Sequence, residues 1–270
     1  MNLWPNYDTE RAGEVGVSPS RGPNSIFPGM YSPSGRAWIV LLLALAPLTR
    51  GAAQAPRPVG QGEPLVSSRF AWTVGAALFV SVWLDTSVRE GALEMQGAWS
   101  DRAASVAKTF GEGRYVFPVL GLSYAAGRVS GLRPLADVSG HALLATASAG
   151  LATAALKRLV GRERPYVAGS PSTFDPLKFK NESFPSGHTA VAFALATTFA
   201  AETPDRVSDV FFFVGATMTG LSRIYHDRHW LTDVVAGAGV GYLAGRWATR
   251  AHRRIPLSVG PGGVMLQLTF

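Results

Sequence analysis

The stretch 222–247 reads SRIYHDRHWLTDVVAGAGVGYLAGRW and joins a charged segment to an apolar one. Arg223, His229 and Asp233 stand near its start. Three glycines then recur at every fourth position: Gly237, Gly241 and Gly245. Such a repeat of small residues lets the backbones of two membrane helices approach closely. Ionisable side chains at the end of a membrane helix are a functional signal. The stretch therefore predicts a closely packed helix with functional residues at its beginning.

Five further apolar segments precede this one, at about 70–84, 115–128, 139–156, 187–203 and 208–225. No cluster of alternating β-branched residues competes with them, so the sequence predicts an all-α protein built as a bundle of six helices. The more polar residues 86–113 are consistent with either an amphipathic helix or a loop. Residues 157–185 are rich in glycine and proline, which predicts a long ordered loop, and such loops are usually functional.

We expect this six-helix bundle to be transmembrane, although its uncharged runs are shorter than the roughly 20 residues that a spanning helix needs. Several tryptophans lie near the segment ends, where interfacial anchors are found. These are Trp38, Trp72, Trp83, Trp230 and Trp247. The alternative is a soluble helical bundle with buried helices.

The composition excludes several classes of protein. Hydrophobic residues make up 47% of the 270 residues and charged residues 16%, which excludes a disordered protein. There is no cysteine, so disulfides, thiolate zinc sites and cysteine nucleophiles are excluded. The net charge of +7 suits an anionic lipid or a phosphate-bearing substrate. We expect no nucleic-acid partner, because the basic residues do not form runs interleaved with aromatic residues.

The two ends of the chain differ from its apolar middle. Arg36, the apolar run 37–48 and the sequence Ala53-Gln54-Ala55 together resemble a secretory signal peptide. An uncleaved N-terminal anchor is the alternative, and Met30 is a candidate for the true start. The predicted boundaries are an extension with the signal-like segment at 1–55, a linker at 56–69, the helical domain at 70–248, and a basic tail with a short β-hairpin-like segment at 249–270.

Three motifs carry the candidate chemistry of the helical domain. They are Lys157 with Arg164-Pro165, then Pro185-Ser186-Gly187-His188, and then Ser222-Arg223 with His229 and Asp233. Each motif lies where a predicted helix begins or ends. If the last four helices alternate in direction, the three motifs meet at one rim of the bundle.

The residue types of these motifs suit a phosphate ester. Lys157, Arg164 and Arg223 are three cations whose donors match phosphate oxygens. Ser186 is a predicted N-cap, and the backbone amides that follow it, beginning with that of Gly187, would face an anion from a helix N-terminus.

The histidines suit acid–base and nucleophilic chemistry. His229 and Asp233 are four residues apart, so we expect them one above the other on a helix face. The carboxylate can then fix the tautomer of the imidazole and stabilise positive charge on it. His188 is a second histidine that is available as a general acid.

In these motifs the chain resembles the type 2 phosphatidic acid phosphatase superfamily, which includes vanadium haloperoxidases and bacterial non-specific acid phosphatases. The resemblance covers roughly residues 70–247, and six apolar helices make it closer to the lipid-phosphatase branch. It implies that His229 is the nucleophile, that Asp233 orients it and that His188 protonates the leaving alcohol. It assigns phosphate binding to Lys157, Arg164, Ser186, Gly187 and Arg223. It also implies a phosphatase that needs no metal or other cofactor.

We therefore expect a metal-independent phosphatase that hydrolyses a lipid phosphate monoester or diphosphate through a phosphohistidine intermediate. Its expected partners are a phosphorylated lipid and the membrane; the particular lipid and the oligomeric state stay open. The expected location is the bacterial inner membrane with the site facing the periplasm, and a periplasmic or outer-membrane location is the alternative. The rival functions are a soluble periplasmic acid phosphatase, a vanadate-dependent haloperoxidase and a non-catalytic lipid-phosphate-binding protein.

Overall fold

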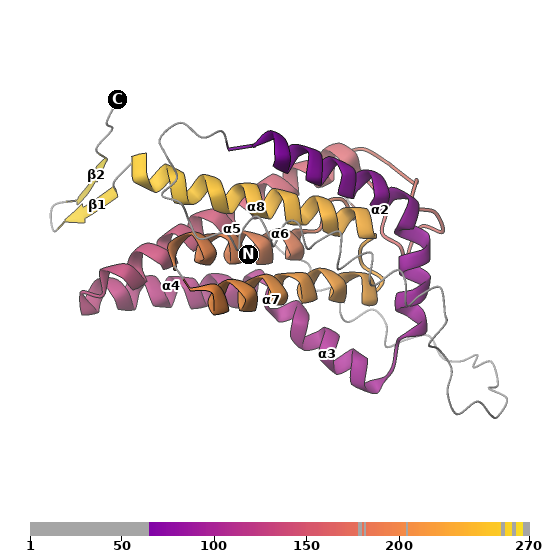
Figure 1. The fold of residues 1–270 in the computed structure, drawn as a ribbon, viewed down its shortest axis with the longest axis horizontal. Helices are drawn as coiled ribbons and strands as arrows, with labels where there is room; N and C mark the ends of the chain where they lie inside the picture. The colour runs from indigo at the N-terminus through magenta and orange to yellow at the C-terminus, as the bar shows by residue number, and fades with distance from the viewer. Residues whose placement is uncertain are drawn as a thin grey trace. The chain divides into compact units, whose positions relative to one another are not determined.

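A computed structural model describes residues 65–177, 180, 182–203, 205–254, 257–260 and 263–266. The predicted signal-like segment and most of the predicted linker lie outside the described residues. The helices are α2 (Ser68–Glu94), α3 (Ala98–Thr109), α4 (Gly113–Ser130), α5 (Arg133–Val160), α6 (Gly187–Glu202), α7 (Arg206–Tyr225) and α8 (Leu231–Arg254) (Figure 1). The strands β1 (Leu257–Gly260) and β2 (Gly263–Leu266) pair antiparallel.

The described residues thus contain seven helices, and the predicted number of six is corrected. Six of the helices correspond to the six apolar segments, and α3 is the additional one, within the residues that suited either a helix or a loop. This helix packs against α7 and buries only Ala104, while Trp99 and Val106 are exposed. Its short sequence is more polar on average than the other helices and buries little, which explains why the sequence did not decide between helix and loop.

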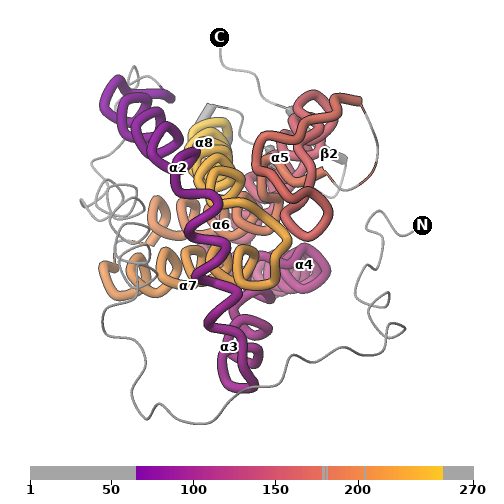
Figure 2. Tube along the Cα trace, turned by 90° about the vertical axis from the view of Figure 1, so that its right-hand side faces the viewer, coloured from indigo at the N-terminus to yellow at the C-terminus, as the bar shows by residue number. Residues whose placement is uncertain are grey.

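The core of the bundle forms around α6. This helix packs against α5, α7 and α8, and Figure 2 shows these three helices around it. Its sequence, GHTAVAFALATTFAAE, is apolar or small on all sides, and most of its residues are buried. A helix of this composition is stable only when neighbours cover every face. The position of α6 therefore follows from its sequence.

The glycine repeat of α8 lies against α6. A Cβ atom at Gly237 would be 2.5 Å from the carbonyl oxygen of Ser186, and one at Gly245 would be 2.7 Å from Cβ of Thr197. Such distances leave no room for a side chain, so the two backbones are in direct contact. This close packing fixes the start of α6 beside the first turns of α8.

A loop connects α5 to α6. It begins at Gly161, whose φ of 61° is in the left-handed region and whose amide donates to the carbonyl of Lys157 at 2.8 Å. Isolated β-bridges join Arg162 to Phe174 and Glu163 to Glu182. The loop is therefore folded back on itself, which brings its last residues close to the end of α5.

Two helices, α2 and α5, are long and apolar enough to cross a membrane by length and composition. Only 17% and 22% of their most apolar windows are buried inside the molecule. Large apolar side chains point outward instead: Trp72, Phe79, Trp83 and Leu151 are between 68% and 80% exposed. Exposed apolar surface of this kind marks contact with lipid or with another protein.

Candidate active site

The predicted site residues lie where α5 and α7 end and where α6 and α8 begin (Figure 1). They are Lys157 in the last turn of α5, Arg164 in the following loop, Ser186, Gly187 and His188 at the start of α6, Arg223 in the last turn of α7, and His229 and Asp233 at the start of α8. The positive charges of three of them act on the buried ring of His229. The structure thus brings the three motifs together.

His229 lies two residues before α8, and its ring Nδ1 is 3.3 Å from Oδ2 of Asp233. The same Asp233 oxygen accepts the backbone N–H of Trp230 at 2.9 Å. Here an acidic residue in the first turn reaches back to the amide that precedes the helix, as in one half of a capping box. The expected stacking of His229 and Asp233 on one helix face is thereby corrected, because the cap and not the helical repeat brings the carboxylate to the ring. A carboxylate on Nδ1 holds a proton there and leaves Nε2 as the basic nitrogen.

The start of α6 is attached to the start of α8. Ser186 is the N-cap of α6, and its hydroxyl accepts the amide of Thr189 at 3.5 Å. The amide of Ser186 donates to the carbonyl oxygen of Asp233 at 2.9 Å. A Cβ at Gly111, between α3 and α4, would collide with the carbonyl of His188, so that connection encloses the first turn. The N-terminus of α6, where backbone amides favour an anion, therefore has a fixed position beside His229.

Two cations converge on the backbone just before α6. Nζ of Lys157 donates to the carbonyl oxygens of Ser183 at 2.8 Å and Glu182 at 3.3 Å. Nε of Arg164 donates to the same Glu182 oxygen at 3.3 Å. With Arg223 they make a positive field that an anion would neutralise.

Both histidines of the site have lowered pKa values. Burial, followed by the positive charges of Lys157, Arg164 and Arg223, holds the pKa of His229 well below the ordinary histidine value, against a backbone hydrogen bond with Ser183. Burial and the same three cations, together with His229, likewise hold the pKa of His188 well below it. Beside three cations, one neutral imidazole can act as a nucleophile, and the other can act as an acid once it is protonated.

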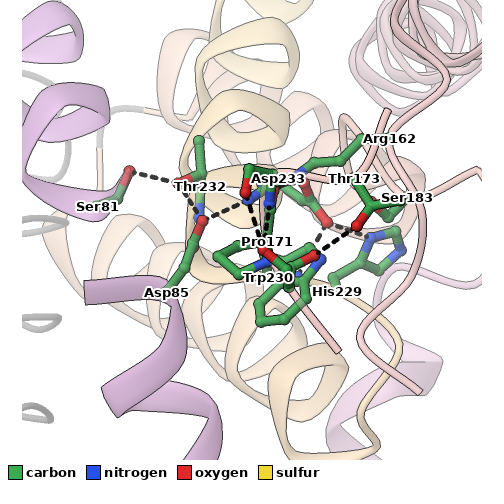
Figure 3. A network of polar contacts seen from close by, with 12 residues as sticks. Ser81, Asp85, Arg162, Pro171, Thr173, Ser183, His229, Trp230, Thr232 and Asp233 are labelled. Carbon is green, nitrogen blue, oxygen red and sulfur yellow. Dashed lines mark hydrogen bonds and ion pairs between the residues drawn. The ribbon is translucent and has the colours of Figure 1, made fainter. Parts of the chain in front are cut away.

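Sequence reasoning missed two charged residues that contact the site, Arg162 and Asp85 (Figure 3). Arg162 donates to Asp233, and Asp85 in α2 contacts both Arg162 and Thr232. The signal for Asp85 was an acidic residue directly after the apolar segment 70–84, since an ionisable group inside a membrane helix is a functional candidate. Arg162 had no comparable signal, because it is one of several basic residues in the loop. In the part of the chain that the structure describes, no three His, Cys, Asp or Glu side chains are grouped so that they could hold a metal ion.

Residues 139–256 match the family described as the PAP2 superfamily. This part of the chain is a PAP2 superfamily domain. The match begins inside α5 and ends after α8, so it includes all three motifs. The helices α2, α3 and α4 precede it, and with them Asp85.

Two curated relatives are similar to parts of this chain. It is 51% identical over 65 residues to a lipid A 1-phosphatase of Porphyromonas gingivalis, which is 23% of this chain and 15% of the relative. It is 37% identical over 94 residues to a non-specific acid phosphatase of Salmonella typhimurium, which is 33% of this chain and 37% of the relative. The chain therefore spans well under half the length of these two relatives.

The similarity of fold to a solved structure extends beyond the matched residues. The crystal structure of a transmembrane PAP2 type phosphatidylglycerolphosphate phosphatase from Bacillus subtilis is similar with a TM-score of 0.50 at 19% identity. The similarity covers 82% of this chain and 96% of that one. At this identity it concerns the fold alone, and it includes helices outside residues 139–256.

Proposed function

We propose that the chain is a metal-independent phosphatase that hydrolyses a lipid phosphate monoester or diphosphate through a phosphohistidine at His229. The environment of this ring carries the proposal: Asp233 lies on its Nδ1, and the charges of Lys157, Arg164 and Arg223 surround it. In such a site the cations would bind the phosphoryl oxygens while a neutral imidazole attacks phosphorus. The names of both curated relatives, a lipid A 1-phosphatase and an acid phosphatase, support phosphate ester hydrolysis.

The reaction would proceed in two steps. In the first, Nε2 of His229 bonds to phosphorus as the bond between phosphorus and the leaving oxygen breaks, and His188 gives a proton to that oxygen. Asp233 stabilises the positive charge that develops on the His229 ring. In the second step His188 accepts a proton from water, whose oxygen attacks phosphorus, and inorganic phosphate leaves His229.

The proposed substrate is a phosphorylated lipid that stays in the bilayer. The outward apolar side chains of α2 and α5 support a membrane location, since they would face lipid chains. A lipid phosphate could then enter the site with its headgroup while its chains remain among lipids. Because a relative is named a lipid A 1-phosphatase, a lipid A 1-phosphate is the first substrate to test.

The proposed location is the bacterial inner membrane, with the site toward the periplasm. The helix α8 begins at the site and ends with several arginines, including Arg246, Arg250 and Arg254. Basic residues favour the cytoplasmic side of a membrane. If the end of α8 is cytoplasmic, the site at its start faces the opposite side.

The test is phosphate release by detergent-solubilised protein from a lipid A 1-phosphate, a phosphatidic acid and a polyprenyl diphosphate. We expect His229→Ala to lower kcat by about 10⁴-fold or more, as loss of a catalytic nucleophile does. Rapid quenching with ³²P-labelled substrate should trap label on the wild-type protein and none on the variant. The matched control is His226→Asn, because His226 caps α7 through its Nδ1, 2.6 Å from the carbonyl of Ser222. Retained turnover in His229→Ala would refute the mechanism.

A soluble acid phosphatase is the second candidate, and the Salmonella typhimurium relative favours it. That function predicts that a small water-soluble ester, such as p-nitrophenyl phosphate, is hydrolysed at least as fast as any lipid. The proposed function predicts the reverse preference, and activity that survives treatment with a chelator. Loss of activity with EDTA and its recovery with a divalent cation would contradict the metal-independent mechanism.

A further inference from the structure

Arg162 is a buried arginine that belongs to none of the three motifs. Its side chain is 5% exposed, and the two carboxylates that it contacts are fully buried. Its Nη1 donates to Oδ1 of Asp233 at 2.8 Å, and its Nη2 donates to Oδ2 of Asp85 at 2.5 Å. Figure 3 shows this network between Asp85 on one side and His229 on the other. A buried cation thus connects α2 to the carboxylate that contacts the candidate nucleophile.

The donors of Arg162 point toward the protein and not toward a phosphate. Its Nε donates to the carbonyl of Pro171 at 2.8 Å, so each of its three nitrogens has an acceptor within the protein. The guanidinium also lies 5.5 Å from the ring centroid of Trp230. The donors of this arginine are therefore used inside the fold, which suits a positioning role.

Asp85 holds the beginning of α8. Its Oδ1 accepts the backbone N–H of Thr232 at 2.8 Å, and its Oδ2 accepts the hydroxyl of the same residue at 2.9 Å. The residue just before α8 is Trp230, whose side chain has no oxygen that could cap the helix. Asp85 supplies the missing acceptor from another helix, and its charge lies at the positive end of the α8 dipole.

The carboxylate of Asp233 is consequently held at both oxygens. Oδ1 accepts from Arg162, while Oδ2 accepts the amide of Trp230 and lies 3.3 Å from Nδ1 of His229. Rotation of this fully buried carboxylate would break bonds at both oxygens and leave its hydrogen bonds unsatisfied. The orientation of the His229 ring thus depends on contacts made by two residues outside the motifs.

We propose that Arg162 and Asp85 are positioning residues, which fix the Asp233 carboxylate and thereby the tautomer and orientation of the His229 ring. The inference rests on the proposed function of His229 as the nucleophile. Asp85 lies in α2, outside the matched residues 139–256, so a helix that precedes the PAP2 match would be required to align the catalytic pair.

The kinetic test uses Asp85→Asn, which keeps the shape of the side chain and removes its charge. We expect kcat to fall about 100-fold, because a misplacement of about 1 Å can cost that much. KM should stay within about twofold of wild type, since the cations that bind phosphate are unchanged. Arg162→Lys tests the same contact if Asp85→Asn does not fold, because a lysine cannot bridge two carboxylates with a planar fork.

The matched control is Arg89→Gln. Arg89 of α2 makes a separate ion pair, with its Nε 2.6 Å from Oδ1 of Asp227 before α8, and it does not contact Asp233. We expect this variant to keep wild-type kcat even if its thermal midpoint drops. Equal losses of kcat in Arg89→Gln and Asp85→Asn would mean that α2 only anchors the fold, and would overturn the inference.

A second measurement does not depend on turnover. In protein labelled with ¹⁵N-histidine, the signal of His229 is assigned by its absence in His229→Gln. We expect the Nδ1–H tautomer in the wild type and in Arg89→Gln, and a mixture of tautomers in Asp85→Asn and Arg162→Lys. Unchanged tautomers in both positioning variants would refute the inference even if the wild type were active. An inactive wild type with the expected tautomers would instead refute the proposed function and leave the inference supported.

Discussion

The cations of the site lower the pKa values of its two histidines. The charges of Lys157, Arg164 and Arg223 lower the pKa of His229 and of His188, in addition to burial. A bound phosphate would offset these charges and raise both pKa values again. In the proposed mechanism the raised pKa lets His188 carry the proton that it gives to the leaving oxygen, while His229 attacks as a neutral imidazole. The same three cations would both bind the substrate and keep the nucleophile unprotonated before binding.

The pH dependence of kcat/KM should reflect this arrangement. Because kcat/KM reports the free enzyme, its acid limb follows the pKa of unliganded His229, which lies below the ordinary value of 6.5. Activity should therefore persist below pH 6.5 and decline only as the pH falls through the lowered pKa. The measurement is kcat/KM against pH, corrected for the separately measured titration of the substrate phosphate.

Removing one cation provides the control for this pH profile. Arg164→Gln takes away one of the charges that lower the pKa of His229, so its acid limb should move to higher pH than in the wild type. An unchanged limb in Arg164→Gln, or a wild-type limb above pH 6.5, would contradict the assignment of His229.

The contact between α6 and α8 determines the geometry of the site, because each helix contributes its first turn. A Cβ at Gly241 would collide with the carbonyl of Ala190 and lie 2.9 Å from the amide nitrogen of Ala194. The three glycines of α8 therefore allow its backbone to touch that of α6. A larger separation would weaken the hydrogen bond from Ser186 to Asp233, which joins the two helix starts.

The substitution Gly241→Ala should destabilise the protein and reduce its activity. Forcing a methyl group into a closely packed contact typically costs about 1–3 kcal/mol. The matched control on the same helix is Gly239→Ala, since a Cβ there would be 3.4 Å from Val74 Cγ1, an ordinary van der Waals distance. Thermal midpoints in detergent and phosphate release would be measured for both variants. Equal stability of the two would show that the α6–α8 contact can relax.

The sequence predicted the elements well where an apolar segment or a motif was continuous. The helices α5 to α8 and the residues at their ends could be located because hydrophobic runs and polar motifs alternate along the chain. The contact between Arg162 and Asp85 could not be predicted, because they are 77 residues apart and pair only when α2 packs beside α8. The cap that brings Asp233 to His229 was also missed, since a spacing of four residues fits both a helix face and a capped helix start.

Among the described residues, the polar groups of the candidate site lie at helix ends, whereas large apolar side chains point outward from α2 and α5. Leu151 and Leu159 of α5 are 74% and 64% exposed. In a soluble bundle both leucines would contact water. In a membrane protein Leu151 would lie within the hydrocarbon core, and Leu159 would lie outside it. Position along the helix thus distinguishes the two alternatives that the sequence left open.

An arginine at each of these two positions tests whether α5 crosses a membrane. At about 1.5 Å per residue, Leu151 lies about 7 Å from the middle of the helix and Leu159 about 19 Å from it. In a hydrocarbon core about 30 Å thick, only Leu151 would be inside. We therefore expect Leu151→Arg to lower the amount of protein that stays in membranes after an alkaline wash, since a central arginine costs about 2.5–3.5 kcal/mol. Leu159→Arg and Leu151→Ala should behave like the wild type. Equal recovery of all variants from the soluble fraction would instead indicate a soluble bundle, because a water-exposed leucine can become an arginine at either position with little effect.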